Sequence, residues 1–164
     1  MKRGTPAHPK TLDLMQRLGC DLAKAVGTIE LLLHFAAQFA PLGNVGKWAD
    51  EAIAKAVGWE GDAGQIIAHL VGSRWLDTSD EHRLIVHDWS EHADDSVHLA
   101  VARSVRLFAD GCMPRISRLS TAERSKIEQQ LMDLCARRAH AVHTEYAPPC
   151  LSLPSPPLPS QEAG

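Results

Sequence analysis

Residues 45–89, VGKWADEAIAKAVGWEGDAGQIIAHLVGSRWLDTSDEHRLIVHDW, decide the fold of this chain. Their pattern predicts a short strand at Val45 and then a helix over residues 48–57, whose apolar side chains recur at helical spacing. A glycine-flanked turn at residues 58–61 ends that helix. Asp62 can cap the helix that follows, which we expect to end at Val71.

Two extended segments come directly after the second helix. Residues 74–77 and 83–87 contain the apolar and β-branched side chains typical of strands, and the polar residues 78–82 join them as a hairpin loop. A long apolar helix, capped by Asp21 and ended near Ala40, precedes the whole stretch. The predicted order of helix, strand, helix, helix, strand, strand is that of a winged helix-turn-helix.

The remainder of the chain predicts more helices and a tail. Residues 8–18 form an amphipathic helix, and two further helices cover residues 90–110 and 120–143, the second opened by the capping box Ser120-Thr121-Ala122-Glu123. Beyond Tyr146, prolines and serines dominate. We therefore predict a mainly α fold with a small β-wing: a winged helix-turn-helix domain at 1–89, a C-terminal helical extension at 90–146 and a disordered Pro/Ser-rich tail at 147–164.

Composition is that of a soluble globular protein, with 45% hydrophobic and 23% charged residues. No apolar run is long enough for a membrane helix, and no signal peptide is visible behind the basic start. The four cysteines are scattered, which is typical of reduced thiols in the cytoplasm. We expect a cytoplasmic protein that does not bind membranes.

The charge of the chain is unevenly distributed. Residues 1–95 contain 9 Lys/Arg and 14 Asp/Glu, whereas residues 96–164 contain 8 Lys/Arg and 6 Asp/Glu. DNA-binding domains usually present a basic face. The acidic balance of the predicted winged-helix half therefore counts against DNA binding, unless its basic residues cluster locally.

Several segments resemble a known family. They are residues 30–37 (ELLLHFAA), 43–48 (GNVGKW), 56–59 (AVGW) and 84–89 (LIVHDW). Over residues 8–95 the chain is similar to the amino-terminal winged-helix domains of phage and prophage replication proteins of the DnaD-like or replisome-organiser type. The resemblance implies a role in replication initiation or its regulation. Nothing in the chain resembles the helical second domain with which the better-known members contact single-stranded DNA or helicase.

Two functions remain open on this basis. As a double-stranded DNA-binding protein, the chain would place residues 62–71 in the major groove, with Gln65 and His69 reading base edges. Lys47 and Arg74 would contact phosphates, and His82 and Arg83 of the wing would contact the backbone or the minor groove. As an assembly module, the chain would bind replication proteins or itself through residues 90–143, without direct contact to DNA.

Enzymatic chemistry is not expected, because the chain has no nucleophile elbow, Walker loop or dinucleotide fingerprint. The sequence places potential metal ligands close together at His87, Asp88, His92, Asp94, Asp95 and His98. The alternative is that Asp88 caps a helix and that Asp94 and His98 form a surface pair. A second set, Cys112, Cys135, His140 and His143, lacks the short knuckles of a structural zinc site. We predict neither a metal nor another cofactor.

Overall fold

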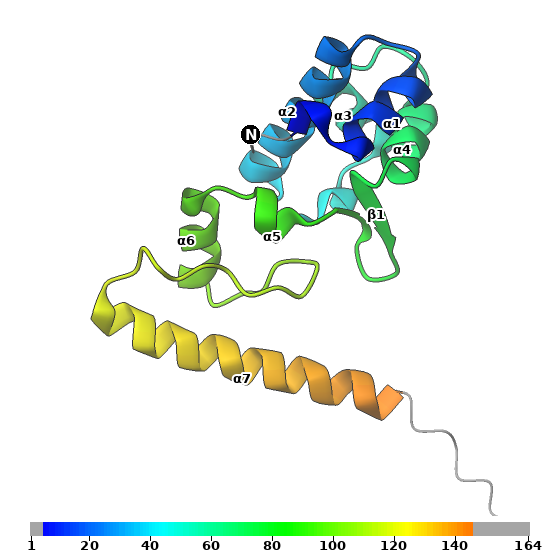
Figure 1. The fold of residues 1–164 in the computed structure, drawn as a ribbon. Helices are drawn as coiled ribbons and strands as arrows, with labels where there is room; N and C mark the ends of the chain where they lie inside the picture. The colour runs from blue at the N-terminus through cyan, green and yellow to red at the C-terminus, as the bar shows by residue number, and fades with distance from the viewer. Residues whose placement is uncertain (1–4, 146–164) are drawn as a thin grey trace, which may run out of the picture.

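The computed structural model describes the backbone of residues 5–145 and the side chains of residues 6–138. The described chain is mainly helical, with one two-stranded antiparallel sheet (Figure 1). In chain order the elements are η1 (Thr5–Ala7), α1 (Pro9–Leu18), α2 (Leu22–Phe39), η2 (Val45–Lys47), α3 (Asp50–Ala56), α4 (Ala63–Gly72), β1 (Leu76–Ser79), β2 (Arg83–Val86), α5 (Trp89–His92), α6 (Asp95–Arg103) and α7 (Thr121–Glu145).

The predicted ends of α1 and α2 are confirmed. Gly19 ends α1 in the left-handed conformation, with a φ of 58°. The Asp21 carboxylate then accepts a hydrogen bond from the Lys24 amide and so caps α2, which ends at Phe39. Helix α1 packs against both α2 and α4, and thereby fixes the position of α4 on the body of the protein.

Helices α3 and α4 form the predicted pair. Gly58 adopts a left-handed φ of 71° after α3, while the amides of Gly58 and Trp59 bond to the Lys55 and Ala54 carbonyls. This arrangement is a Schellman motif, which explains why the helix stops there. Asp62 caps α4 by accepting from the Gln65 amide at 2.8 Å, as its position in the sequence predicts.

The strand predicted at Val45 is wrong, since residues Val45–Lys47 form the short 3-10 helix η2. The Trp48 amide closes this turn on the Val45 carbonyl at 3.0 Å. The segment nevertheless lies against β2, where the Val86 amide donates to the Gly43 carbonyl at 2.9 Å. The outer edge of β2 is therefore covered by η2, and the hydrogen bond from Val86 to Gly43 stands in place of the pairing with a third strand.

The hairpin is confirmed, with different limits. Strand β1 begins at Leu76 rather than at Arg74, and continues to Ser79, which pairs with Arg83. Residues 80–82 are the connection, so the loop is shorter than the predicted 78–82. Arg74 cannot start the strand because it takes a left-handed φ of 60° at the end of α4.

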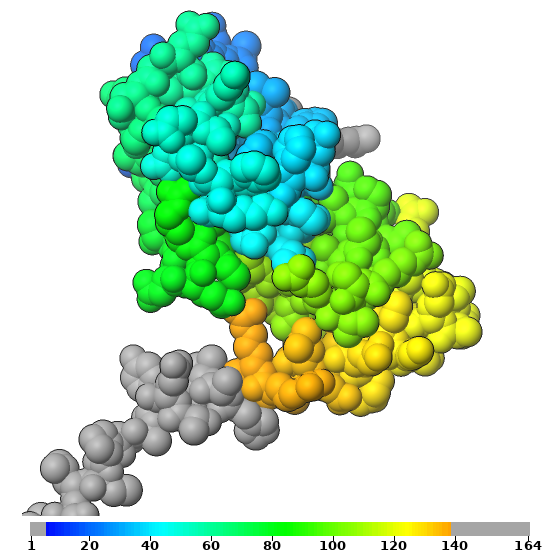
Figure 2. All heavy atoms as spheres, turned by 180° about the vertical axis from the view of Figure 1, so that it is seen from behind, coloured from blue at the N-terminus to red at the C-terminus, as the bar shows by residue number. Residues whose placement is uncertain are grey.

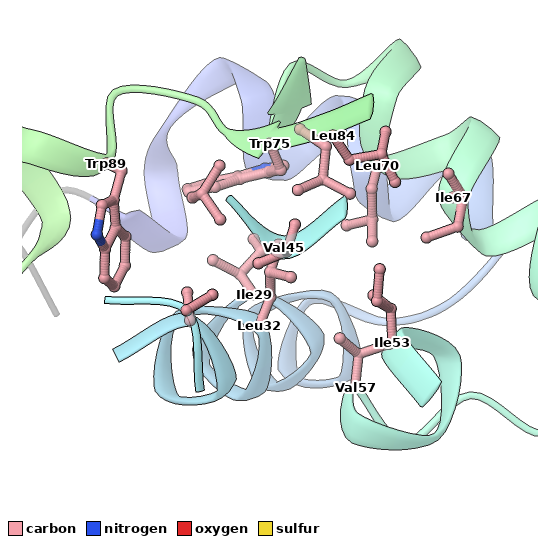
Figure 3. Packing of buried hydrophobic residues seen from close by; sticks show 14 of the residues in the cluster. Ile29, Leu32, Val45, Ile53, Val57, Ile67, Leu70, Trp75, Leu84 and Trp89 are labelled. Carbon is pink, nitrogen blue, oxygen red and sulfur yellow. The ribbon is translucent and has the colours of Figure 1, made fainter. Parts of the chain in front are cut away.

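A first hydrophobic core lies between α2, α3, α4 and the hairpin (Figure 3). Val45 projects from η2 into its middle, between Ile29 and Leu32 of α2 and the side chains of Leu70 and Leu84. All five are at most 3% exposed. The core continues past residue 89, because Ala93, Val97, Val101 and Phe108 belong to the same cluster.

The helix predicted over residues 90–110 is wrong. It is divided into α5 and α6, because the Asp94 carboxylate accepts from the Val97 amide and starts a new helix. Helix α6 ends at Arg103, and residues 104–120 fold back without a helix of their own. A second core follows, in which Ala102, Leu107 and Leu119 pack against Ile127 and Leu131 of α7.

Helix α7 begins as predicted. The Ser120 hydroxyl and the Glu123 carboxylate bond to each other at 2.7 Å, and each faces the other residue's amide at 3.4 Å. The proline-rich segment at 147–164 lies outside the described residues. Among the helices that are described, none has the length and apolar character to cross a membrane.

Candidate nucleic-acid interface

Helix α4 has two distinct faces. Ile66, Ile67 and Leu70 are buried on the inner face, at most 9% exposed. The outer face contains Gly64, Gln65, Ala68 and Gly72, which are exposed, and His69, which is half-buried. Gln65 and His69 therefore share an accessible surface that has no bulky side chain of its own helix beside them.

Arg74 occupies the end of α4. Its amide bonds to the Val71 carbonyl and the Trp75 amide bonds to the Leu70 carbonyl, which again is a Schellman motif. Glycine is the usual residue at this left-handed position, yet here an arginine is used. The turn directs the exposed Arg74 away from the core at the point where α4 passes into the hairpin.

Lys47, His82 and Arg83 come together at the loop end of the hairpin. They line a shallow hollow of about 310 Å³ with Asp80 and Glu81. The Lys47 ammonium also lies 5.8 Å from the centre of the Trp48 ring, and the Glu81 carboxylate lies 3.5 Å from His82 Nε2. The two carboxylates reduce the attraction of this hollow for phosphate.

Arg83 makes bonds that its sequence position does not predict. Its Nε donates to the Gly46 carbonyl at 3.0 Å, and its two Nη atoms contact the Asp50 carboxylate and the Trp48 carbonyl. These three bonds connect β2 to η2 and to the first turn of α3. In this structure the Arg83 guanidinium connects the hairpin to the helix pair, while its side chain stays 46% exposed.

An acidic hollow lies beside the first turn of α4. It has a volume of about 490 Å³ and is lined by Asp50, Glu51 and Asp62, with Lys55 as its cation. Asp50 is paired with Arg83. The remaining carboxylates oppose the approach of a phosphate backbone at this end of the helix.

His87 lies between two carboxylates. Its Nδ1 is 2.6 Å from Asp77 and its Nε2 is 2.9 Å from Asp88, which also bonds to Lys10 at 3.3 Å. Burial raises the pKa of Asp88, but the hydrogen bond from Lys10 and the charge of His87 outweigh it, and the pKa lies below its usual value. Asp88 makes no side-chain capping bond to α5, contrary to the alternative considered above.

His98 is buried, at 2% exposure, so a surface pair with Asp94 is wrong. Its Nδ1 accepts from the Arg115 amide at 2.9 Å, which leaves Nε2 as the protonated nitrogen that donates to the Ser90 carbonyl at 3.0 Å. Burial, aided by the charge of Arg115, lowers the pKa of His98. The described residues contain no group of three or more potential ligands placed to hold a metal ion.

An aromatic patch, here defined as Leu31, Phe35, Phe39 and Trp48, lies on the outer side of α2. The rings of Phe35, Phe39 and Trp48 are between 5.5 and 6.1 Å apart. Leu31, Phe39 and Trp48 are 46%, 44% and 38% exposed. No sequence signal separates this patch from the core face of α2, because the helix is apolar around much of its circumference.

The six residues predicted to contact DNA thus fall into separate places. Gln65 and His69 lie on α4, Arg74 lies at its end, and Lys47, His82 and Arg83 lie at the loop end of the hairpin. Comparison of the chain with models of known families, with curated proteins and with solved structures finds no match in any of the three.

Proposed function

We propose that the chain is a winged-helix DNA-binding protein of the phage or prophage type, acting in replication initiation or its regulation. The observation that carries the proposal is the outer face of α4, where Gln65 and His69 lie among small residues on a helix anchored by a buried inner face. The hairpin that follows at once, β1 with β2, corresponds to the wing. The assignment to replication depends on the resemblance over residues 8–95.

Small residues support this use of α4 because they let a helix approach the floor of a groove. The major groove of B-DNA is about 12 Å wide and admits one helix. The Gln65 amide offers both a hydrogen-bond donor and an acceptor, which match N7 and N6 of adenine in the major groove. His69 lies one turn further along the same face. Lys47 and Arg74 supply the phosphate contacts. With few cations, we expect a shallow dependence of affinity on salt.

The test is a fluorescence-anisotropy titration of the full chain with a mixed-sequence duplex at low salt. The double variant Gln65→Ala/His69→Ala should bind about tenfold more weakly or worse, since base-edge contacts contribute about 1–3 kcal/mol. Gln38→Ala, at an exposed position of α2, is the control and should bind like the wild type. Equal affinity of the double variant and the wild type would refute the assignment of α4.

A second candidate is a winged-helix assembly module without direct DNA contact. The aromatic patch and the acidic hollow at α4 favour it, since exposed aromatic side chains are enriched at protein interfaces and carboxylates oppose DNA. In that case light scattering would show an oligomer that Phe39→Ser/Trp48→Ser converts to a monomer, while the duplex gives no anisotropy change. Deleting residues 90–164 is a poorer test, because it removes Val97, Val101 and Phe108 from the first core.

A further inference from the structure

An open cleft lies where the hairpin loop, residues 105–109 and the second half of α7 meet. Its volume is about 620 Å³, within the range of small-molecule sites, roughly 300–1,000 Å³. Figure 2 shows the orange atoms of α7 next to the green atoms of the hairpin and the yellow-green segment that follows α6. We call this space the arginine cleft, because Arg106, Arg137 and Arg138 line it.

The charge of the arginine cleft is positive. Three arginines and one glutamate, Glu81, leave a formal charge of +2 with His82 neutral. Arg138 lies 3.4 Å from Glu81, and Arg137 Nε donates to a backbone carbonyl, that of Asp133. Arg106 makes no ion pair with any residue that the structure describes. Two of the three guanidinium groups thus have no carboxylate partner within the described chain.

The rest of the lining is apolar. Leu42, Val105 and Leu134 line it with half-buried side chains, whereas Leu107 and Phe108 are 8% and 0% exposed and offer little or no accessible surface. A bare nucleic-acid backbone gains little from such a surface. An anion with an apolar body would bury that body against Val105 and Leu134 while its charged group met the arginines.

The backbone of the cleft contains a strained residue. Val105 follows α6 with a φ of 51°, and the amides of Val105 and Arg106 close a Schellman motif on α6. At the corresponding positions α1 and α3 use Gly19 and Gly58, for which a positive φ is free of strain. A β-branched residue in this conformation is an outlier, and such strain is concentrated at functional sites. It places the Val105 side chain in the cleft wall.

We propose that the arginine cleft binds a small organic anion, with a phosphate or carboxylate group attached to an apolar body. Arg106 and Arg137 hold the anionic group, Val105 and Leu134 contact the apolar body, and the anion competes with Glu81 for Arg138. The site is independent of whether α4 binds DNA. Occupancy would weaken the Glu81–Arg138 contact, which joins the hairpin loop to α7.

The experiment is an isothermal titration of the full chain with 1-naphthyl phosphate and with 1-naphthoate, beside 1-naphthol and inorganic phosphate. One or both aromatic anions should bind at a single site. Tighter binding of 1-naphthyl phosphate would indicate a phosphate ligand, and tighter binding of 1-naphthoate would indicate a carboxylate ligand. Naphthol and phosphate alone should each bind at least about tenfold more weakly, since each makes only part of the contacts. Failure of both aromatic anions to bind overturns the proposal.

Three variants locate the binding. Arg106→Ala should weaken it about tenfold, because a hydrogen bond to a charged group contributes about 1.5–3 kcal/mol. Glu81→Gln should strengthen it about threefold by freeing Arg138. Lys126→Ala, at an exposed position of α7 outside the cleft, should leave it unchanged. Thermal melting checks that each variant is folded.

Unchanged binding in both Arg106→Ala and Glu81→Gln would place the probe elsewhere and overturn the assignment. The proposal also fails if duplex DNA displaces the probe and Arg106→Ala weakens DNA binding equally, because the arginines would then form a nucleic-acid surface. Loss of DNA binding in the α4 variants, with the probe still bound, bears on the proposed function alone.

Discussion

His98, in α6, contacts both α5 and the segment of residues 104–120. Its ring bonds to Ser90 before α6 and to Arg115 after it, and it packs edge-on against Phe108 with 5.0 Å between ring centres. The sequence suggests a surface histidine four residues from Asp94. Its burial depends on residues 104–120 folding back over α6, which helical periodicity cannot reveal.

We predict that acid destabilises the chain through His98. Because the folded-state pKa is lowered, the unfolded chain binds the proton more readily. The stability contributed by neutral His98 is complete above the unfolded pKa of about 6.5 and is lost as pH falls through the lower folded pKa. Protonation would also set an Nδ1–H against the Arg115 amide. Urea unfolding between roughly pH 7 and pH 5 should show the decline.

The control is His98→Gln, which has no titrating ring. It should be less stable than the wild type at neutral pH and should show a smaller decline over the same interval. The pKa values of Asp88 and Asp94 are also lowered, but the stability that they contribute is lost mainly below about pH 5, outside the measured interval. Parallel pH profiles for variant and wild type would contradict the role given to His98.

Helix limits were largely predictable at the scale of single elements. Caps are local, so Asp21, Asp62 and the Ser120–Glu123 box can be recognised without knowledge of the tertiary structure. The break between α5 and α6 was also signalled locally, by Asp94 before Asp95 and Ser96, but the apolar spacing of residues 97–108 outweighed it. Two apolar periodic patterns only a few residues apart resemble the pattern of a single helix.

Element η2 shows what local signals cannot give. Val45 has the strand preference of a β-branched residue, yet its neighbour Gly46 lies against the backbone of β2. The same limit applies to Arg83, whose position on the hairpin predicts a phosphate contact but whose guanidinium bonds to η2 and α3. In both cases the conformation depends on contacts with residues that are remote in sequence.

We predict that Gly46→Ala destabilises the chain strongly, by about 1–3 kcal/mol or more. A Cβ there would lie 2.1 Å from the His82 carbonyl oxygen and 2.4 Å from the Leu84 amide nitrogen, and neither backbone atom can move without disturbing β2. Gly27→Ala is the matched control. It lies within α2 with no atom near the new methyl, and should stabilise by about 0.5–1 kcal/mol. Chemical denaturation of both variants measures their free energies of unfolding. A similar change in the two variants would show that Gly46 does not pack tightly against β2.

The molecule as a whole is organised around two cores that meet at α6. Val97 and Val101 enter the first core, while Ala102 enters the second. The second core is small, and α7 contributes Ile127 and Leu131 as its buried side chains within the described residues. Figure 1 shows α7 extending well beyond α6, away from α1–α4.

We predict that α7 opens more readily than α2. Local opening requires less free energy where fewer apolar side chains are buried. Native-state hydrogen exchange should therefore be faster for the amides of residues 128–138 than for those of residues 29–36. Leu131→Ala should accelerate exchange in α7 and leave α2 unchanged, since a buried leucine contributes about 2–5 kcal/mol. Equal protection of the two helices would mean that α7 is held by more than the second core.

The placement of the indoles gives the chain a label-free optical reporter. Trp75 and Trp89 are enclosed, at 3% and 2% exposure, whereas Trp48 stands at the surface with 38%. A collisional quencher such as acrylamide therefore quenches the fluorescence of Trp48 most efficiently and that of Trp75 and Trp89 least efficiently. A molecule bound on Phe39 and its neighbours would shield Trp48 as well. The half-buried Trp59 adds a constant quenchable background, so the fall in the quenchable fraction of the fluorescence reports how much of that surface is occupied.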